Sequence, residues 1–235
     1  IAQFIDQLIP LGKGDDTQAR YAIESLARYA ARPDHEADRK LVENSILKAL
    51  SSASNNEVKS FLIRRLNYCG SDTSLDILGP LISNEALASA SIGVITTIGS
   101  QAAGSALLAN INNPDLTTQQ QVIQALGSIK YRGAVTALEG LSSSLNKVIY
   151  SSALYALAKI AAPSSKDILS KAAKSAKFKT DDSDAMIAYI EYAKNLGLNG
   201  QKELSKTVCN EILKNTKSDE QLYIRSAAFS ILSNN

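Results

Sequence analysis

The sequence predicts an all-α protein, an α-α superhelix of about seven helix pairs. Three observations indicate it: apolar residues recur at helical spacing, related segments recur every 29 to 40 residues, and strand-like alternation of apolar and polar residues is absent. Of the 235 residues, 45% are apolar and 20% are charged, which is ordinary for a folded domain and too apolar for a disordered chain. We expect one domain over residues 1–235.

The repeat is clearest in the middle of the chain. Residues 121–129 (QVIQALGSI) align with residues 152–160 (SALYALAKI) at an offset of 31, and residues 90–98 (ASIGVITTI) lie another 31 residues back. Apolar residues in the first segment lie 3, 4 and 7 positions apart, which is one face of a helix. The equivalent anchor positions along the chain are Leu26, Leu66, Ile95, Leu126, Leu157, Ala193 and Phe229.

A second, shorter helix is expected after five of these first helices. The expected ranges are 75–82, 102–111, 134–141, 166–173 and 202–213. Asn55, Asn84 and Ser218 each stand just before an acidic residue of a first turn, as helix-capping residues do. Four of the five prolines fall at expected helix ends, whereas Pro80 lies within a predicted helix and should kink it or delay its start.

Several residues are expected to serve the core rather than a site. Cys69 and Cys209 lie 140 residues apart and are expected to be buried as small apolar side chains, which leaves the redox compartment open. Tyr189 and Tyr192 align with core positions. The uncharged run of residues 86–114 is broken by Ser, Thr and Asn, so no transmembrane segment is expected. With a single His in the chain, we expect no metal site of several histidines and no cofactor.

Residues 113–141 (NPDLTTQQQVIQALGSIKYRGAVTALEGL) carry a resemblance to a known repeat. A loop aspartate, Asp115, precedes an apolar helix that contains Ala-Leu-Gly, and a second helix follows. The segment resembles a HEAT-type repeat, which implies a HEAT-like solenoid. The Val-Arg pair common in such repeats is missing, because residues 121–124 read Gln-Val-Ile-Gln. This departure weakens any inference of function from HEAT repeats, but it does not weaken the inference of the architecture.

A closer resemblance covers residues 11–99. Its residues are Gly14-Asp15-Asp16, Ala19-Arg20-Tyr21-Ala22, Arg32-Pro33 and Glu57-Val58-Lys59-Ser60-Phe61-Leu62. The region resembles the helical repeats that precede a 3-keto-disaccharide hydrolase-like domain in exported bacterial proteins. The resemblance implies a helical module of a longer chain, located in the periplasm or cell envelope. It also implies no enzyme activity in this region. The first residue, Ile1, agrees with a removed leader or an excised piece.

Three short motifs that could suggest chemistry are expected to be structural. Residues 12–15 (GKGD) lack the P-loop spacing and a preceding strand. Residues 181–184 (DDSD) begin like a calcium loop but lack its glycine at the sixth position and its glutamate at the twelfth. His35 has no converging ligands in the sequence. We therefore expect a turn, a helix cap and a surface residue, with no catalytic residue and no metal ligand.

The sharpest binding hypothesis is a polar ridge on the helices that line the concave side of HEAT-like arrays. Tyr68 and Tyr155 would offer aromatic platforms, and Gly93 would leave a gap. Such a ridge suits a protein, a neighbouring domain of the same chain or a glycan better than nucleic acid; alternatively, it only keeps the array solvated. Its candidate residues are Arg28, Arg64, Tyr68, Gln124, Tyr155, Lys159 and Glu191, flanked by Glu24, Thr97, Ser128 and Asn195.

A lysine-rich face supports the alternative hypothesis, an autonomous binder of an anionic polymer such as nucleic acid. Its residues are Lys166, Lys171, Lys174, Lys177 and Lys179, with Asp167 as the only acid among them. A net charge of +2 and the absence of Trp make nucleic acid the weaker expectation. The function predicted first is therefore a non-catalytic scaffold or interaction module, accessory to a carbohydrate-active domain.

Overall fold

A computed structural model describes residues 1–234, and all the regular structure in that range is helical, as predicted. Fourteen α-helices and four short 3-10 turns follow one another, and no strand occurs among the described residues. The chain divides into two compact units, Ile1–Val122 and Ile123–Asn235, and the boundary falls inside helix α8 (Leu116–Ser128). The single domain predicted over residues 1–235 stays a prediction.

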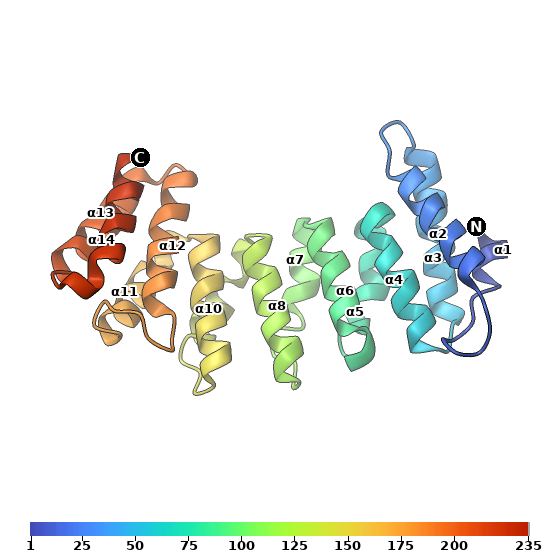
Figure 1. The fold of residues 1–235 in the computed structure, drawn as a ribbon, viewed down its shortest axis with the longest axis horizontal. Helices are drawn as coiled ribbons and strands as arrows, with labels where there is room; N and C mark the ends of the chain where they lie inside the picture. The colour runs from blue at the N-terminus through green and yellow to red at the C-terminus, as the bar shows by residue number, and fades with distance from the viewer. Residues whose placement is uncertain (235) are drawn as a thin grey trace. The chain divides into compact units, whose positions relative to one another are not determined.

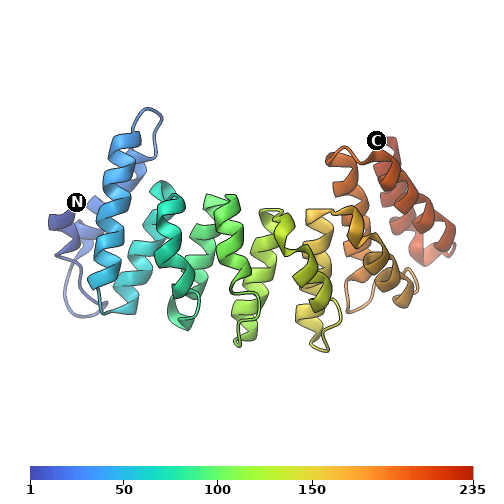
Figure 2. The ribbon, with the colours of Figure 1, turned by 180° about the vertical axis from the view of Figure 1, so that it is seen from behind.

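Unit 1 consists of two layers of helices. The first layer holds α2 (Thr17–Ala30), α4 (Asn56–Cys69) and α6 (Glu85–Ile98). The second holds α3 (Glu36–Ser52), α5 (Leu75–Leu81) and α7 (Gln101–Leu108), while the short α1 (Ala2–Ile5) packs against α2 and α3. Figure 1 shows α4 and α6 side by side in front, and Figure 2, seen from behind, brings α5 and α7 forward.

Unit 2 repeats this two-layer arrangement. Its first layer holds α10 (Lys147–Ile160), α12 (Ala185–Leu198) and α14 (Leu222–Ser233), which contact one another in that order. Its second layer holds α9 (Val135–Leu141), α11 (Lys166–Ser175) and α13 (Lys202–Asn215). Consecutive helices of the two layers pack as pairs, so the HEAT-like solenoid fold predicted from the repeats is confirmed.

The apolar anchors form the core in the middle of the chain but not at the ends. Leu66, Ile95 and Leu157 are at most 1% exposed. Leu26 is only half-buried, and Phe229 is 58% exposed. In α14 the buried residues are Ile224 and Ala228, so the anchor expected at Phe229 was wrong by one position. A terminal helix buries one narrow face, so the repeat pattern fixes its register less firmly.

Helix starts follow the predicted capping residues. The side chain of Asn55 accepts from the backbone N–H groups of Glu57 and Val58, at 2.9 and 3.2 Å, and Asn84 accepts from Ala86 at 3.1 Å. Ser218 and Gln221 form a capping box before α14. These bonds satisfy first-turn donors that have no partner inside the helix. Pro80 lies in the last turn of α5, and the helix ends one residue after it.

Carboxylates of the second layer tie successive helix pairs together. Glu43 of α3, which is 3% exposed, accepts from the hydroxyl groups of Ser71 and Ser74, at 2.8 and 2.7 Å. Glu139 of α9 accepts from the hydroxyl of Ser165 at 3.1 Å in the same way. In both cases the serine precedes the next helix of the second layer, so the acid fixes where that helix begins.

The residues expected to belong to the core are found there. Cys69 and Cys209 are free thiols exposed by at most 1%, and burial raises their pKa to about 12 and about 11. Tyr189 and Tyr192 are fully buried. Among residues 1–234, no helix combines the length and apolarity needed to cross a bilayer.

Candidate functional site

The polar ridge of unit 1 is linked sideways from helix to helix. The guanidinium carbon of Arg28 on α2 lies 5.0 Å from the ring centroid of Tyr68 on α4, a cation–π contact. Further along, the hydroxyl of Thr97 on α6 donates to Asn67 on α4 at 3.0 Å. The structure therefore brings together Arg28 and Tyr68, as their shared ridge implied. These links hold the side chains of three helices in one continuous surface.

A hollow of about 580 Å³ lies beside this ridge. It is formed by α4 together with residues of α2, α6 and the loop before α2. Arg64, predicted as a ridge residue, is exposed and lines the hollow. The complete lining is Leu11, Arg20, Asn56, Glu57, Ser60, Phe61, Arg64, Arg65 and Ala86. Three arginines in one hollow give it the donors for an anionic ligand.

Arg20 is fixed by its neighbours and cannot move to meet a ligand. Its Nε donates to Asp16 at 2.8 Å, and its two terminal nitrogens donate to the carboxylate of Glu57 at 2.8 and 2.9 Å. A fourth bond reaches the carbonyl of Ile9 at 3.0 Å. The bonds to Glu57 and Asp16 raise the pKa of Arg20, and the bond from Arg20 lowers the pKa of Asp16. Arg20 therefore joins α2, α4 and the preceding loop into one rigid wall.

Phe61 and Arg65 form another part of the lining. The guanidinium carbons of Arg20 and Arg65 each lie 4.7 Å from the ring centroid of Phe61. Arg65 also forms an ion pair with Glu24, which Arg28 binds from the other side at 2.7 Å. The hydrogen bond from Arg28, with the charge of Arg65, lowers the pKa of Glu24. The buried Nε of Arg65 has no hydrogen-bond partner, so this arginine keeps an unused donor.

The charges around the hollow leave a small cationic excess. Four guanidinium groups, those of Arg20, Arg28, Arg64 and Arg65, face three carboxylates. Within the described residues, Arg64 is the member of this group that has no ion pair. Its planar side chain offers two parallel N–H donors, the geometry that fits a carboxylate. The hollow can therefore accept one negative charge without displacing an existing pair.

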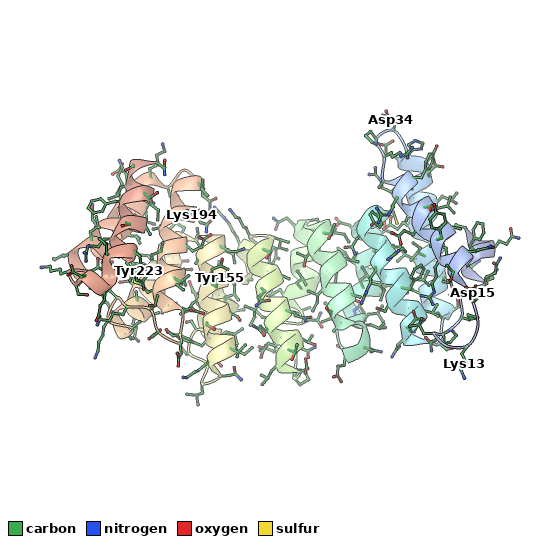
Figure 3. All side chains as sticks on the ribbon, in the orientation of Figure 1. Lys13, Asp15, Asp34, Tyr155, Lys194 and Tyr223 are labelled. Carbon is green, nitrogen blue, oxygen red and sulfur yellow. The ribbon has the colours of Figure 1, made fainter. Side chains whose placement is uncertain are left out.

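In unit 2 three of the predicted ridge residues, Tyr155, Lys159 and Glu191, find partners within their own helices. Lys159 lies with its Nζ 5.3 Å from the ring centroid of Tyr155, and Lys194 pairs with Glu191 at 3.6 Å. Figure 3 shows Tyr155 on α10 and Lys194 on α12. Gln124 of α8 is exposed. Asn195 was expected on the exposed ridge, but it is only 5% exposed because it lies on the packed side of α12. Its amide donates to the side chain of Glu191.

The lysine-rich face is largely neutralised by nearby acids. Lys174 pairs with Glu211 at 3.0 Å, and Lys179 pairs with Glu220 at 3.2 Å. Lys166 pairs with its neighbour Asp167 at 3.5 Å. Both glutamates lie more than thirty residues further along the chain, so the sequence window that suggested a basic patch did not contain them. Over residues 1–234, the structure gives no ion pair to the two remaining lysines, Lys171 and Lys177.

The three motifs set aside in the sequence have structural roles. Asp15 accepts from the backbone N–H of Thr17 at 2.9 Å, at the start of α2. Asp181 accepts from the backbone N–H of Ser183 at 3.0 Å. His35 contacts Asp38 at 2.8 Å. Among the described residues, no group of three or more His, Cys, Asp and Glu side chains is placed to hold a metal ion.

Three residues of the hollow were missed as site residues. Phe61 and Arg65 lie four residues apart on α4, which periodicity gives, but Arg20 meets them only because α2 and α4 pack with a particular offset. The adjacent pair Arg64-Arg65 was the available signal, because only one of two neighbouring arginines on a helix can lie on the outer ridge. The other must lie beside a neighbouring helix, where it needs an acid.

The comparison with solved structures supports the fold, whereas the two sequence comparisons gave no match. No family model matches the chain, and no curated protein matches it. The complex of CpcE and CpcF of phycocyanin lyase from Nostoc sp. PCC7120 matches with a TM-score of 0.50 and 14% identity, covering 99% of this chain and 95% of that one. An engineered protein matches with a TM-score of 0.45 and 18% identity, covering 97% and 71%. The first likeness supports the helical-repeat fold.

Proposed function

We propose that the chain is a non-catalytic interaction module that binds a protein partner across the α2–α4–α6 face of unit 1. The observation that carries the proposal is the arginine–aromatic surface of that face, linked from α2 to α4 and hollowed beside Arg64. Arg and Tyr are enriched where proteins meet, because they contribute large contacts and directed hydrogen bonds. In unit 2, Tyr155 and Glu191 are engaged within their own helices, which favours the unit 1 face.

Other features of the chain agree with a binding role. A polar face on a stack of helix pairs is how repeat proteins commonly bind their partners. The similar structure of CpcE and CpcF is itself a complex of two proteins, the kind of association proposed here. The predicted attachment to a sugar-acting domain, the export and glycan binding stay predictions. The anionic-polymer alternative has less support, since Lys166, Lys174 and Lys179 have acidic partners.

A bulky side chain placed on the proposed face tests the function. Gly93 on α6 is exposed, and a Cβ added there meets nothing within 4 Å. Gly93→Trp should therefore leave the fold intact and cover the surface beside Thr97 and Asn67. We expect wild-type chain, immobilised and exposed to an extract of its source cells, to retain a partner that the variant does not retain.

Gly140→Trp is the matched control. Gly140 on α9 is also exposed and has open space around it, but it lies in the second layer of unit 2. We expect this variant to retain the partner as the wild type does. Equal retention by all three chains would place the partner elsewhere and contradict the proposal. Circular dichroism spectra of the variants should match that of the wild type.

A further inference from the structure

The hollow of unit 1 has the chemistry of a receptor for one carboxylate. Resting on the proposed function, we infer that the partner contributes an acidic segment whose Glu or Asp side chain enters this hollow and binds Arg64. The guanidinium of Arg64 is exposed and has no ion pair within residues 1–234, whereas Arg20, Arg28 and Arg65 are each tied to acids of the chain. The unpaired guanidinium is the group left to recognise a ligand.

The side chains around Arg64 are already held in place before a ligand binds. Arg20 is held by four hydrogen bonds, and Arg65 is held by Glu24 and by contact with Phe61. Because these ion pairs and contacts exist before a ligand arrives, binding at Arg64 requires little ordering of its surroundings.

The charge balance selects a single carboxylate over a polyanion. Four guanidinium groups face three carboxylates, so one added negative charge neutralises the cluster. Unit 1 as a whole carries ten Lys and Arg against thirteen Asp and Glu, a formal charge of −3 that opposes a polyphosphate chain. A side-chain carboxylate brings one charge in the planar geometry of the guanidinium.

Apolar contacts beside the arginines indicate a peptide rather than a free small acid. Leu11 is 76% exposed at the edge of the hollow, and Phe61 and Ala86 contribute further apolar surface. These groups would pack against apolar side chains next to the acidic residue. The hydroxyl of Ser60 and the amide of Asn56 lie in the same lining and can bond to the peptide backbone. The occupant that fits is an extended segment with one acidic residue and apolar residues beside it.

A labelled peptide with a Leu-Glu-Leu centre and neutral flanks is the probe, measured by fluorescence anisotropy against the whole chain. We expect binding to weaken by about tenfold in Arg64→Gln, and less in Arg64→Lys, which keeps the charge but loses the paired donors. The matching Leu-Gln-Leu peptide should bind the wild type about tenfold more weakly and be insensitive to Arg64→Gln. Arg132→Gln, an equal charge change at an exposed site in unit 2, should leave binding unchanged.

Three outcomes would overturn this inference. In the first, Arg64→Gln and Arg132→Gln bind the acidic peptide equally. In the second, the Gln peptide binds as tightly as the Glu peptide. In the third, single-stranded DNA displaces the peptide and its own binding depends on Arg64, which would indicate a phosphate backbone. If Gly93→Trp still abolishes partner retention while Arg64→Gln does not affect it, the proposed function stands and the carboxylate receptor fails.

Discussion

Glu211 on α13 joins three helices of unit 2 through one carboxylate. It accepts from the hydroxyl of Ser170 on α11 and from the hydroxyl of Tyr189 on α12, both at 2.7 Å, and pairs with Lys174 at 3.0 Å. Burial by itself raises the pKa of Glu211. The three donors lower the pKa by more than burial raises it, so the pKa is about 2. The ionised carboxylate is therefore a stabilising group of the folded chain.

Replacing Glu211 with Gln should make the free energy of unfolding less dependent on pH in the acidic range. The unfolded side chain titrates near 4.5 and the folded one near 2, so its contribution is complete above pH 4.5 and is lost as pH falls towards 2. At about 1.4 kcal/mol for each pKa unit, we expect Glu211→Gln to lower the free energy of unfolding at neutral pH by up to about 3.5 kcal/mol. Urea unfolding over this pH range measures both effects.

Glu203→Gln, on the same helix, is the control for that prediction. Glu203 is exposed and pairs with Lys206 at 2.8 Å, and such surface pairs contribute at most about 1 kcal/mol. We expect Glu203→Gln to retain the wild-type loss of stability between pH 4.5 and 2. The same pH profile in both variants would show that Glu211 is not the group that titrates.

Residue-level features were predictable from the sequence only where one helix decides them. The burial of Tyr189 and the exposure of Arg64 follow from their positions on the apolar and polar faces of their own helices. The partners of Arg65 and Lys174 depend on the offset between two packed helices. Periodicity gives the side of a helix on which a residue lies, but not the neighbour it meets there.

At the scale of elements, the sequence predicts helix ends better than helix registers. The helices expected at 75–82 and 134–141 are found at Leu75–Leu81 and Val135–Leu141, because capping residues and short loops leave little freedom. The expected anchor at Phe229 failed because α14 buries only one narrow face. A central helix packs against neighbours on several sides, so more of its residues are apolar. Its register is therefore easier to predict from the sequence.

Gly127 on α8 lies at a close approach between α8 and α10 in unit 2. A Cβ added to Gly127 would lie 2.8 Å from the Cα of Ala156 on α10, so the two backbones leave no room for a methyl group. We expect Gly127→Ala to lower the free energy of unfolding by about 1 to 3 kcal/mol, although alanine favours helix by up to about 1 kcal/mol. Thermal unfolding of the purified chain measures the change.

Gly140→Ala separates the steric effect from helix propensity. Gly140 also lies in a helix, but nothing stands within 4 Å of an added Cβ. This variant should be as stable as the wild type or more stable by a few tenths of a kcal/mol up to about 1 kcal/mol. If Gly127→Ala also proved stabilising, α8 and α10 would not pack as closely as described.

At the scale of the whole molecule, the two kinds of basic residue are distributed unequally. Six of the eight arginines belong to unit 1, and thirteen of the seventeen lysines belong to unit 2. Unit 2 carries fifteen Lys and Arg against ten Asp and Glu, a formal charge of +5, whereas unit 1 carries −3. Arginine suits directed recognition, and the strongly hydrated lysine suits a solvated surface. By this argument the arginines of unit 1 suit a recognition surface, whereas the lysines of unit 2 give that unit a general positive charge.

That separation predicts weak binding to polyanions that does not involve Arg64. Exposed lysines attract heparin through charge alone, and salt screens such contacts, so we expect the chain to leave a heparin column below about 0.2 M NaCl. The double variant Lys171→Gln/Lys177→Gln removes the two lysines of the face that have no ion pair and should elute earlier, whereas Arg64→Gln should elute close to the wild type. Retention beyond about 0.5 M NaCl that depends on Lys171 and Lys177 would instead indicate a specific polyanion site on unit 2, because steep salt dependence at high affinity requires many simultaneous contacts.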